Sequence, residues 1–189
     1  MRFVSGRSGD SQEFKLRLQS DFALRVTHFN VARWDVQRPC LRWPMTLLLT
    51  HAAATLVMLG VILVVQLVHY PLFRYVEADD YDAFQAAHMR RITWIVAPAM
   101  TTEFATAGWI AWRPPLGLPT WMGWTGLGLA LFIWAATGLV QGPLHRRLTD
   151  GFDAAAHRRL VATNWLRTGA WTLRAGLVLW MLGRAAGAP

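Results

Sequence analysis

Residues 45–70 read MTLLLTHAAATLVMLGVILVVQLVHY, and this stretch decides the fold because it contains no charged side chain. A helix rises 1.5 Å per residue, so about 20 apolar residues cross the roughly 30 Å hydrocarbon core of a bilayer. The stretch is therefore predicted to be a transmembrane helix. Residues 92–112, 121–140 and 160–182 are expected to form three more spans, although they carry some polar groups. The sequence thus predicts an all-α integral membrane four-helix bundle.

The composition of the whole chain agrees with a lipid environment. Hydrophobic residues make up 54% of the 189 residues and charged residues only 16%, with a mean hydropathy of +0.26. The 11 tryptophans suit a membrane interface, where an indole has both apolar and polar neighbours. The net charge of +8 does not predict nucleic-acid binding, because the basic residues are not gathered with aromatic residues on one soluble module. The single cysteine, Cys40, cannot form an internal disulfide.

Residues 1–44 differ from the remainder of the chain. They hold eight of the 19 Lys and Arg residues and show no sustained apolar periodicity. We expect a disordered basic tail here, followed by a transmembrane domain over 45–189. The tail lacks the apolar core of a signal peptide. Translation from Met45 is a further hypothesis, which N-terminal sequencing of the native protein tests.

Charge placement predicts the topology of the chain in the membrane. With four spans, segments 71–91 and 141–159 lie on the same side as loops. The positive-inside rule makes these two loops cytoplasmic, so we expect a multi-pass protein of the cell inner membrane. The arginines of the two loops are Arg74, Arg90, Arg91, Arg146, Arg147, Arg158 and Arg159, whereas the opposite side beyond the tail holds only Arg113 and Arg184.

The two loops also share an internal repeat. Each copy contains a proline-leucine pair, then an aromatic-Asp-Ala triplet, then a histidine close to two arginines. The repeat indicates two pseudo-symmetric helical hairpins related by an axis along the membrane normal. The paired segments are His69-Tyr70-Pro71-Leu72 with Gln141-Gly142-Pro143-Leu144, Tyr81-Asp82-Ala83 with Phe152-Asp153-Ala154, and His88-Met89-Arg90-Arg91 with His157-Arg158-Arg159.

Ionisable residues inside the spans are the candidates for chemistry, because such groups usually face the bundle interior and pair with one another. Glu103 and Arg174 lie at similar depths and are expected to form a buried ion pair. The 3-then-7 spacing of Asn164, Arg167 and Arg174 places these side chains on one face of the fourth helix. We therefore take Glu103, Arg167 and Arg174 as the catalytic candidates; a purely structural ion pair is the alternative.

A second polar layer lies near the cytoplasmic boundary and predicts a small-molecule pocket. For each histidine, contact with lipid headgroups is the competing interpretation. No HxxxH or HExxH spacing is present, so no metal site is predicted, although two facing histidines at one depth would hold a haem. The ligand-binding candidates are His69, His88, Gln141, His145, His157 and Asn164.

The last third of the chain carries a family resemblance. The segment from Gln141-Gly142-Pro143-Leu144-His145 to Asn164-Trp165-Leu166-Arg167-Thr168 resembles the four-helix membrane family of unknown function that includes fungal anthrone oxygenases. His145 stands where that family has Asn. The resemblance implies cofactor-independent oxygenation, with Glu103 or a histidine as the base and Arg167 or Arg174 stabilising an oxyanion. A weaker likeness, through His69 near Pro71-Leu72-Phe73, links the chain to small haem proteins of the protoporphyrinogen oxidase and copper-resistance type.

Three functions remain open from the sequence. The first is an inner-membrane protein whose polar pocket binds or oxidises a small apolar molecule. The second is a haem- or quinone-linked redox protein, with His69 and either His88 or His157 as ligands. The third is a non-enzymatic transporter or assembly subunit. A four-helix transporter would need to form a homodimer.

Overall fold

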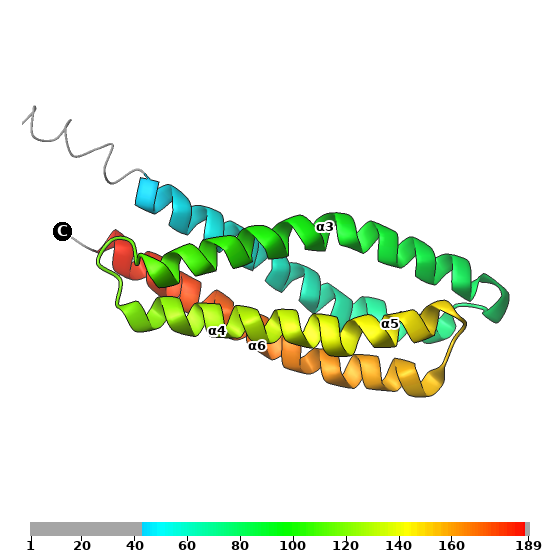
Figure 1. Cartoon of the computed structure of the whole chain (residues 1–189). Helices are drawn as coiled ribbons and strands as arrows, with labels where there is room; N and C mark the ends of the chain where they lie inside the picture. Colours follow the sequence, from blue (N-terminus) through cyan, green and yellow to red (C-terminus); the bar gives the residue numbers. More distant parts are fainter. Residues whose placement is uncertain (1–42, 188–189) are drawn as a thin grey trace, which may run out of the picture. The chain divides into compact units, whose positions relative to one another are not determined.

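A computed structural model describes residues 43–187, which are helical throughout apart from short connections and contain no strand. The all-α prediction is therefore confirmed for this part of the chain. The tail expected over 1–44 lies almost wholly outside the described residues. The helical segments are the first helix (Trp43–Tyr75), α3 (Ala78–Trp112), α4 (Thr120–Ala136), η3 (Thr137–Gln141), α5 (Gly142–Thr149) and α6 (Ala154–Ala186). α4, η3 and α5 form one continuous helix, and the four resulting long helices of the described residues run alternately up and down the bundle (Figure 1).

The helices extend well beyond the predicted spans. Segments 71–91 and 141–159, expected as loops, are mostly helical. Within these two segments, only residues 76–77 and 150–153 are not helical. Pro71 and Pro143 suggested helix ends because proline lacks an N–H and its ring collides with an earlier carbonyl. Both prolines instead lie inside continuous helical segments.

A π-helical turn precedes each of these prolines. The first, η1 (Val65–His69), ends where the Tyr70 N–H donates to the carbonyl of Val65. The second, η3, ends where the Gly142 N–H donates to the carbonyl of Thr137. A π turn contains one more residue than an α turn and so widens the helix. A π turn thus occurs at the same position relative to Pro71 and to Pro143.

The aspartates of the repeat differ in their structural roles. Asp153 is the N-cap of α6, where its Oδ1 accepts the N–H groups of Ala155 and Ala156 at 2.8 and 3.0 Å. These backbone hydrogen bonds, of which the one from Ala156 has the larger effect, hold the pKa of Asp153 below its usual value. Asp82 lies inside α3 and caps nothing. The aromatic residues preceding the two aspartates do meet, since the Tyr81 and Phe152 rings lie 5.2 Å apart.

Many large apolar side chains of the bundle face outward, and several polar and charged ones are buried inside it. Val64, Leu139 and Leu166 are 59%, 78% and 62% exposed. Two helical segments, Trp43–Tyr75 and Thr120–Thr149, are long and apolar enough to cross a membrane, and each contains a stretch of 18 residues with a mean hydropathy of 2.4 and 1.6, respectively. The buried polar and charged side chains include Gln66, Gln141, Glu103, Asn164, Arg167 and Arg174.

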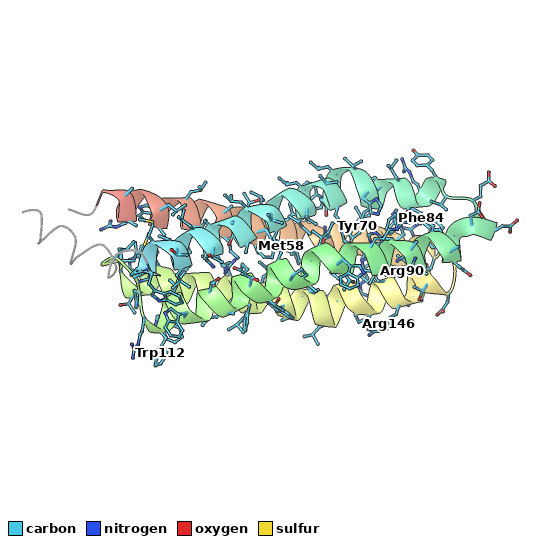
Figure 2. All side chains as sticks on the ribbon, turned by 90° about the horizontal axis from the view of Figure 1, so that it is seen from above. Met58, Tyr70, Phe84, Arg90, Trp112 and Arg146 are labelled. Carbon is cyan, nitrogen blue, oxygen red and sulfur yellow. The ribbon has the colours of Figure 1, made fainter. Side chains whose placement is uncertain are left out.

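The two ends of the bundle differ in character. Arg90 and Arg146 lie toward one end, together with Phe84, whereas Trp112 lies at the other (Figure 2). The end that contains the turns 76–77 and 150–153 also carries Arg74 and Arg158. We call it the arginine-rich end.

Helices α3 and α4 make a close backbone contact at Gly123. A Cβ added at this position would lie 2.8 Å from both the Cα of Ala111 and the carbonyl oxygen of Ile110. Both atoms belong to the backbone, so they cannot move aside as a flexible side chain does. Glycine at this position therefore sets the separation of the two helices.

We predict that Gly123→Ala lowers the free energy of unfolding by about 1–3 kcal/mol, because an inserted methyl must push α3 away from α4. Gly128→Ala is the matched control, since a Cβ there meets nothing within 4 Å. Thermal unfolding in detergent, followed by circular dichroism, measures both variants. Equal behaviour of the two variants would contradict the close contact.

Candidate functional site

A cavity of about 160 Å³ lies between the first helix, α3, η3, α5 and α6. One part of its wall is apolar and includes Met58, Ile62, Val65, Ile92 and Val96. The other part is polar, and its members come from all the surrounding helical segments. The polar lining residues are Tyr70, His88, Thr93, Thr137, Gln141, His145 and Arg167.

His145 lines the cavity and forms hydrogen bonds with two other polar side chains. Its Nε2 is 2.8 Å from the hydroxyl of Tyr70, and its Nδ1 is 3.0 Å from Nε2 of Gln85. Sequence reasoning identified His145 but missed Tyr70 and Gln85 as site residues. Gln85 lies three residues before His88, a spacing that places both on one helix face. That spacing was a usable signal, but it fell in a segment expected to be a loop.

His69 and His88 form a hydrogen-bonded pair. Nε2 of His69 is 2.8 Å from Nδ1 of His88, and the ring centroids are 4.5 Å apart. His88 lines both the cavity and a groove between the first helix and α3, and His69 lines the groove alone. The pair thus connects this groove to the cavity wall.

This arrangement does not suit a haem between His69 and His88. An iron bound by two imidazoles needs a nitrogen on each side of it, each about 2 Å away, whereas these nitrogens bond directly to one another. His157, the other predicted ligand, bonds through its Nε2 to the carbonyl of Tyr70 at 2.7 Å. Among the residues that the structure describes, no group of three or more His, Cys, Asp or Glu side chains is placed to hold a metal ion.

A ladder of side chains positions Arg167 at the cavity. Asn164 donates from Nδ2 to Oε1 of Gln66 at 2.7 Å, and Arg167 donates from a guanidinium N–H to Oδ1 of Asn164 at 2.9 Å. Asn164 does not line the cavity itself. Its place in the structure is therefore between Gln66 and Arg167, where it orients the guanidinium.

Two buried polar atoms of the cavity wall lack a hydrogen-bond partner among the described residues. Gln141 donates from Nε2 to the hydroxyl of Thr163 at 2.9 Å, but its Oε1 is unpartnered. Nε of Arg167 is likewise unpartnered. Both side chains are more than nine-tenths buried. Buried polar groups are normally paired, so an open acceptor and an open donor in one cavity call for an explanation.

The predicted ion pair is present but lies apart from the cavity. Arg174 of α6 pairs with Glu103 of α3, and both side chains are 1% exposed. A second guanidinium N–H donates to the carbonyl of Gly126 in α4. The Arg174 Cζ also lies 5.9 Å from the Trp171 ring centroid. Neither Glu103 nor Arg174 lines the cavity, so the structure separates them from Arg167, the third catalytic candidate.

Comparison with known proteins adds no assignment. The sequence matches no known family model, and neither a curated protein nor a solved structure is significantly similar to it. The resemblance to the anthrone oxygenase family rests on its short motifs alone and stays a prediction.

We predict that Glu103→Gln lowers the free energy of unfolding by about 3–5 kcal/mol, because it leaves the charge of Arg174 buried without a counter-ion. Arg174→Met should have a similar effect, and the double variant should lose less than the sum of the two. Chemical denaturation in mild detergent measures this cycle.

Glu77→Gln provides the control for this cycle, because Glu77 is exposed and makes no side-chain cap. A Glu103→Gln variant as stable as the parent would show that the pair contributes nothing to folding.

Proposed function

We propose that this protein is a four-span inner-membrane protein whose cavity binds a small, mostly apolar molecule carrying one hydroxyl group. The unpartnered Oε1 of Gln141 and Nε of Arg167 carry this proposal. A hydroxyl donates one hydrogen bond and accepts another. It therefore complements an open acceptor and an open donor at the same time.

The size of the cavity limits the ligand. A dry cavity of about 150 Å³ lined by aliphatic side chains holds a molecule of the size of benzene. The cavity here has a volume of about 160 Å³ and a wall of Val, Ile and Met side chains opposite the polar groups. A single-ring phenol fits these dimensions. A three-ring anthrone would require the helices to move apart.

The membrane location is supported by the distribution of side chains. Water-soluble proteins rarely expose large contiguous apolar surfaces, yet many large hydrophobic side chains of this bundle are exposed. Two of the charged groups of α3 and α6, Glu103 and Arg174, are buried against one another. Such pairing is what intramembrane charges require. We therefore propose that α3 and α6 also span, with the two hairpins pseudo-symmetric and the arginine-rich end cytoplasmic.

A cofactor-independent oxygenase is the second candidate function, and it follows from the grouping of histidines and an arginine at one cavity. His145 or His88 would remove a proton from an activated CH₂ group of the substrate, and the charge of Arg167 would stabilise the resulting enolate. Dioxygen would take up the electrons of the substrate. The CH₂ group becomes a carbonyl, and one water is released for each O₂ consumed. Glu103 has no place in this scheme, because it lies outside the cavity.

We predict that the parent protein binds p-cresol and toluene and that Arg167→Met weakens p-cresol binding by about ten- to a hundredfold. Hydrogen bonds to charged groups contribute about 1.5–3 kcal/mol, and toluene makes none. Ligand-induced shifts in thermal unfolding measure both affinities.

A variant that fills the cavity tests the location of this binding. Val96→Phe should abolish binding of both ligands, because Val96 lines the cavity. Val64→Phe makes the same change on the exposed surface, where Val64 is 59% exposed, and should bind as the parent does. Binding that survives Val96→Phe would place the ligand elsewhere.

The topology predicts the accessibility of single cysteines in a chain whose Cys40 is replaced by Ser. In intact cells a membrane-impermeant maleimide should label Arg113→Cys and leave Asp80→Cys unlabelled, because the two positions lie at opposite ends of the bundle and both are exposed. After the cells are broken, Asp80→Cys should react as well. Labelling of Asp80→Cys in intact cells would reverse the orientation.

A further inference from the structure

We propose that a groove between the first helix and α6, at the arginine-rich end, binds an anionic phospholipid. Its phosphate would lie between Arg74 and Arg158, and an acyl chain would follow α6 toward Trp165. The proposal rests on the membrane location proposed above. The groove has a volume of about 640 Å³ and is separate from the cavity; its lining residues are Pro71, Arg74, Phe152, Ala154, His157, Arg158, Val161, Ala162 and Trp165.

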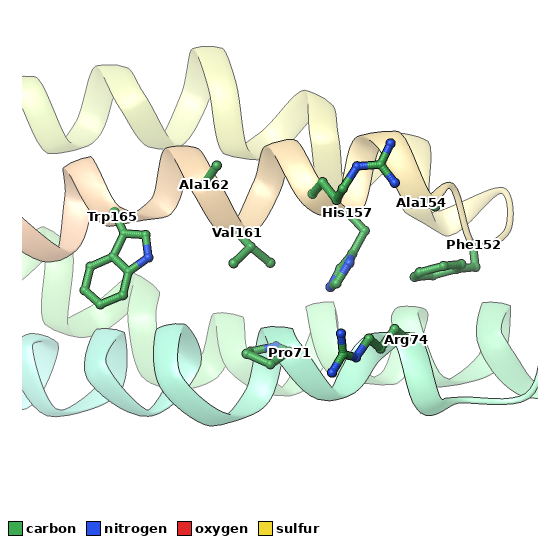
Figure 3. Close-up of a pocket in the computed structure, with 9 residues that line it drawn as sticks. Pro71, Arg74, Phe152, Ala154, His157, Val161, Ala162 and Trp165 are labelled. Atoms are coloured by element: carbon green, nitrogen blue, oxygen red, sulfur yellow. The ribbon is translucent and has the colours of Figure 1, made fainter.

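The groove changes from basic to apolar along its length. Arg74 faces His157 and Phe152 across the groove near the turn, whereas Val161, Ala162 and Trp165 continue along α6 away from it (Figure 3). The intervals of three, four and seven residues from Arg158 keep these side chains on one face of α6. This order matches an amphiphile with a charged head and an apolar chain.

The charge of the groove favours an anion. None of its nine lining residues is acidic. Arg74 donates to the hydroxyl of Tyr75 at 2.7 Å, but within residues 43–187 neither Arg74 nor Arg158 forms a salt bridge. Both side chains are exposed. Arg158 interacts electrostatically with Asp153, which is not a lining residue, and neither guanidinium is held in a direct salt bridge there. Two such groups on opposite walls are suited to a phosphate, which accepts several hydrogen bonds from arginine.

The remaining lining favours a lipid over a free phosphate ion. The groove is far larger than a phosphate ion, and most of its lining is apolar. The apolar surface also continues one turn back along the first helix, where Leu67 and Val68 are 59% and 54% exposed. In the proposed orientation this surface faces the acyl chains of the cytoplasmic leaflet, whose headgroups are negatively charged.

A second copy of the chain is a poorer occupant. In a two-fold dimer the same surface of both copies forms the interface. Four arginines, Arg74 and Arg158 from each chain, would then gather in one interface without an acidic lining residue to pair with them. Like charges brought together in this way oppose association.

The groove is also joined to the cavity by hydrogen bonds. His157, which lines the groove, bonds to the carbonyl of Tyr70, and the hydroxyl of Tyr70 bonds to His145 of the cavity wall. A lipid bound beside His157 therefore touches a group that supports the cavity.

Native mass spectrometry of the full chain, released from detergent with phosphatidylglycerol or phosphatidylcholine added, tests this proposal. We expect the parent to retain one phosphatidylglycerol in preference to phosphatidylcholine. The double variant Arg74→Gln/Arg158→Gln should lower this retention about tenfold or more, because it removes the charge-assisted bonds to the phosphate. Trp165→Ser should lower it too, because the acyl chain loses a contact.

The control removes the same charge at the same end of the bundle. Arg146→Gln/Arg159→Gln should retain the lipid, since Arg146 and Arg159 are exposed and do not line the groove. Equal loss in both double variants would overturn the proposal in favour of a general surface charge effect. Displacement of the lipid by millimolar inorganic phosphate would identify a free-anion site instead. A dimer without bound lipid would identify a second copy as the occupant.

The cysteine labelling described above separates this proposal from the one on which it rests. If the labelling supports a membrane topology and phosphatidylglycerol is not retained, the lipid site alone fails. If the labelling shows no membrane topology, the proposed location fails with it.

Discussion

The bundle depends on the contacts that the buried guanidinium of Arg174 makes with two neighbouring helices. From α6 it reaches the carboxylate of Glu103 on α3 and the carbonyl of Gly126 on α4. One charged group thus joins three helices, and both ions are almost fully buried. Burying such a charge is costly unless its partners are in place. These contacts of Arg174 therefore connect α3, α4 and α6 in the interior of the bundle.

The interior of the bundle contains two polar layers with different roles, one in packing and one at the cavity. The layer around Glu103 and Arg174 is closed: the two side chains bind one another and do not line the cavity. The layer around His145, Gln141 and Arg167 is open, because these side chains line the cavity and the unpartnered atoms of Gln141 and Arg167 belong to its wall. The closed layer accounts for packing. The open layer is where binding is to be sought, and a sequence pattern of buried charges cannot by itself distinguish the two.

The sequence predicted the parts of the fold that depend on apolar runs and helix faces. The helices, the pairing of Glu103 with Arg174, and the shared face of Asn164 and Arg167 all follow from hydropathy and spacing. The extent of the helices did not, because a proline signals a helix end, and nothing in the local sequence announces the π turns that precede Pro71 and Pro143. Tyr70 and Gln85 were missed for the same reason, since they lay in or beside segments taken for loops.

The π turns before Pro71 and Pro143 have a consequence for how the site is built. Each turn adds one residue to its helix, and one residue corresponds to about 100° of rotation. Every side chain beyond the turn is therefore rotated relative to an uninterrupted α-helix. Tyr70 and His145 both lie beyond a π turn, and their side chains meet at 2.8 Å. Their contact thus depends on the extra residue in each π turn as well as on the identity of the two side chains. Deleting one residue from either π turn would separate the two side chains without changing Tyr70 or His145.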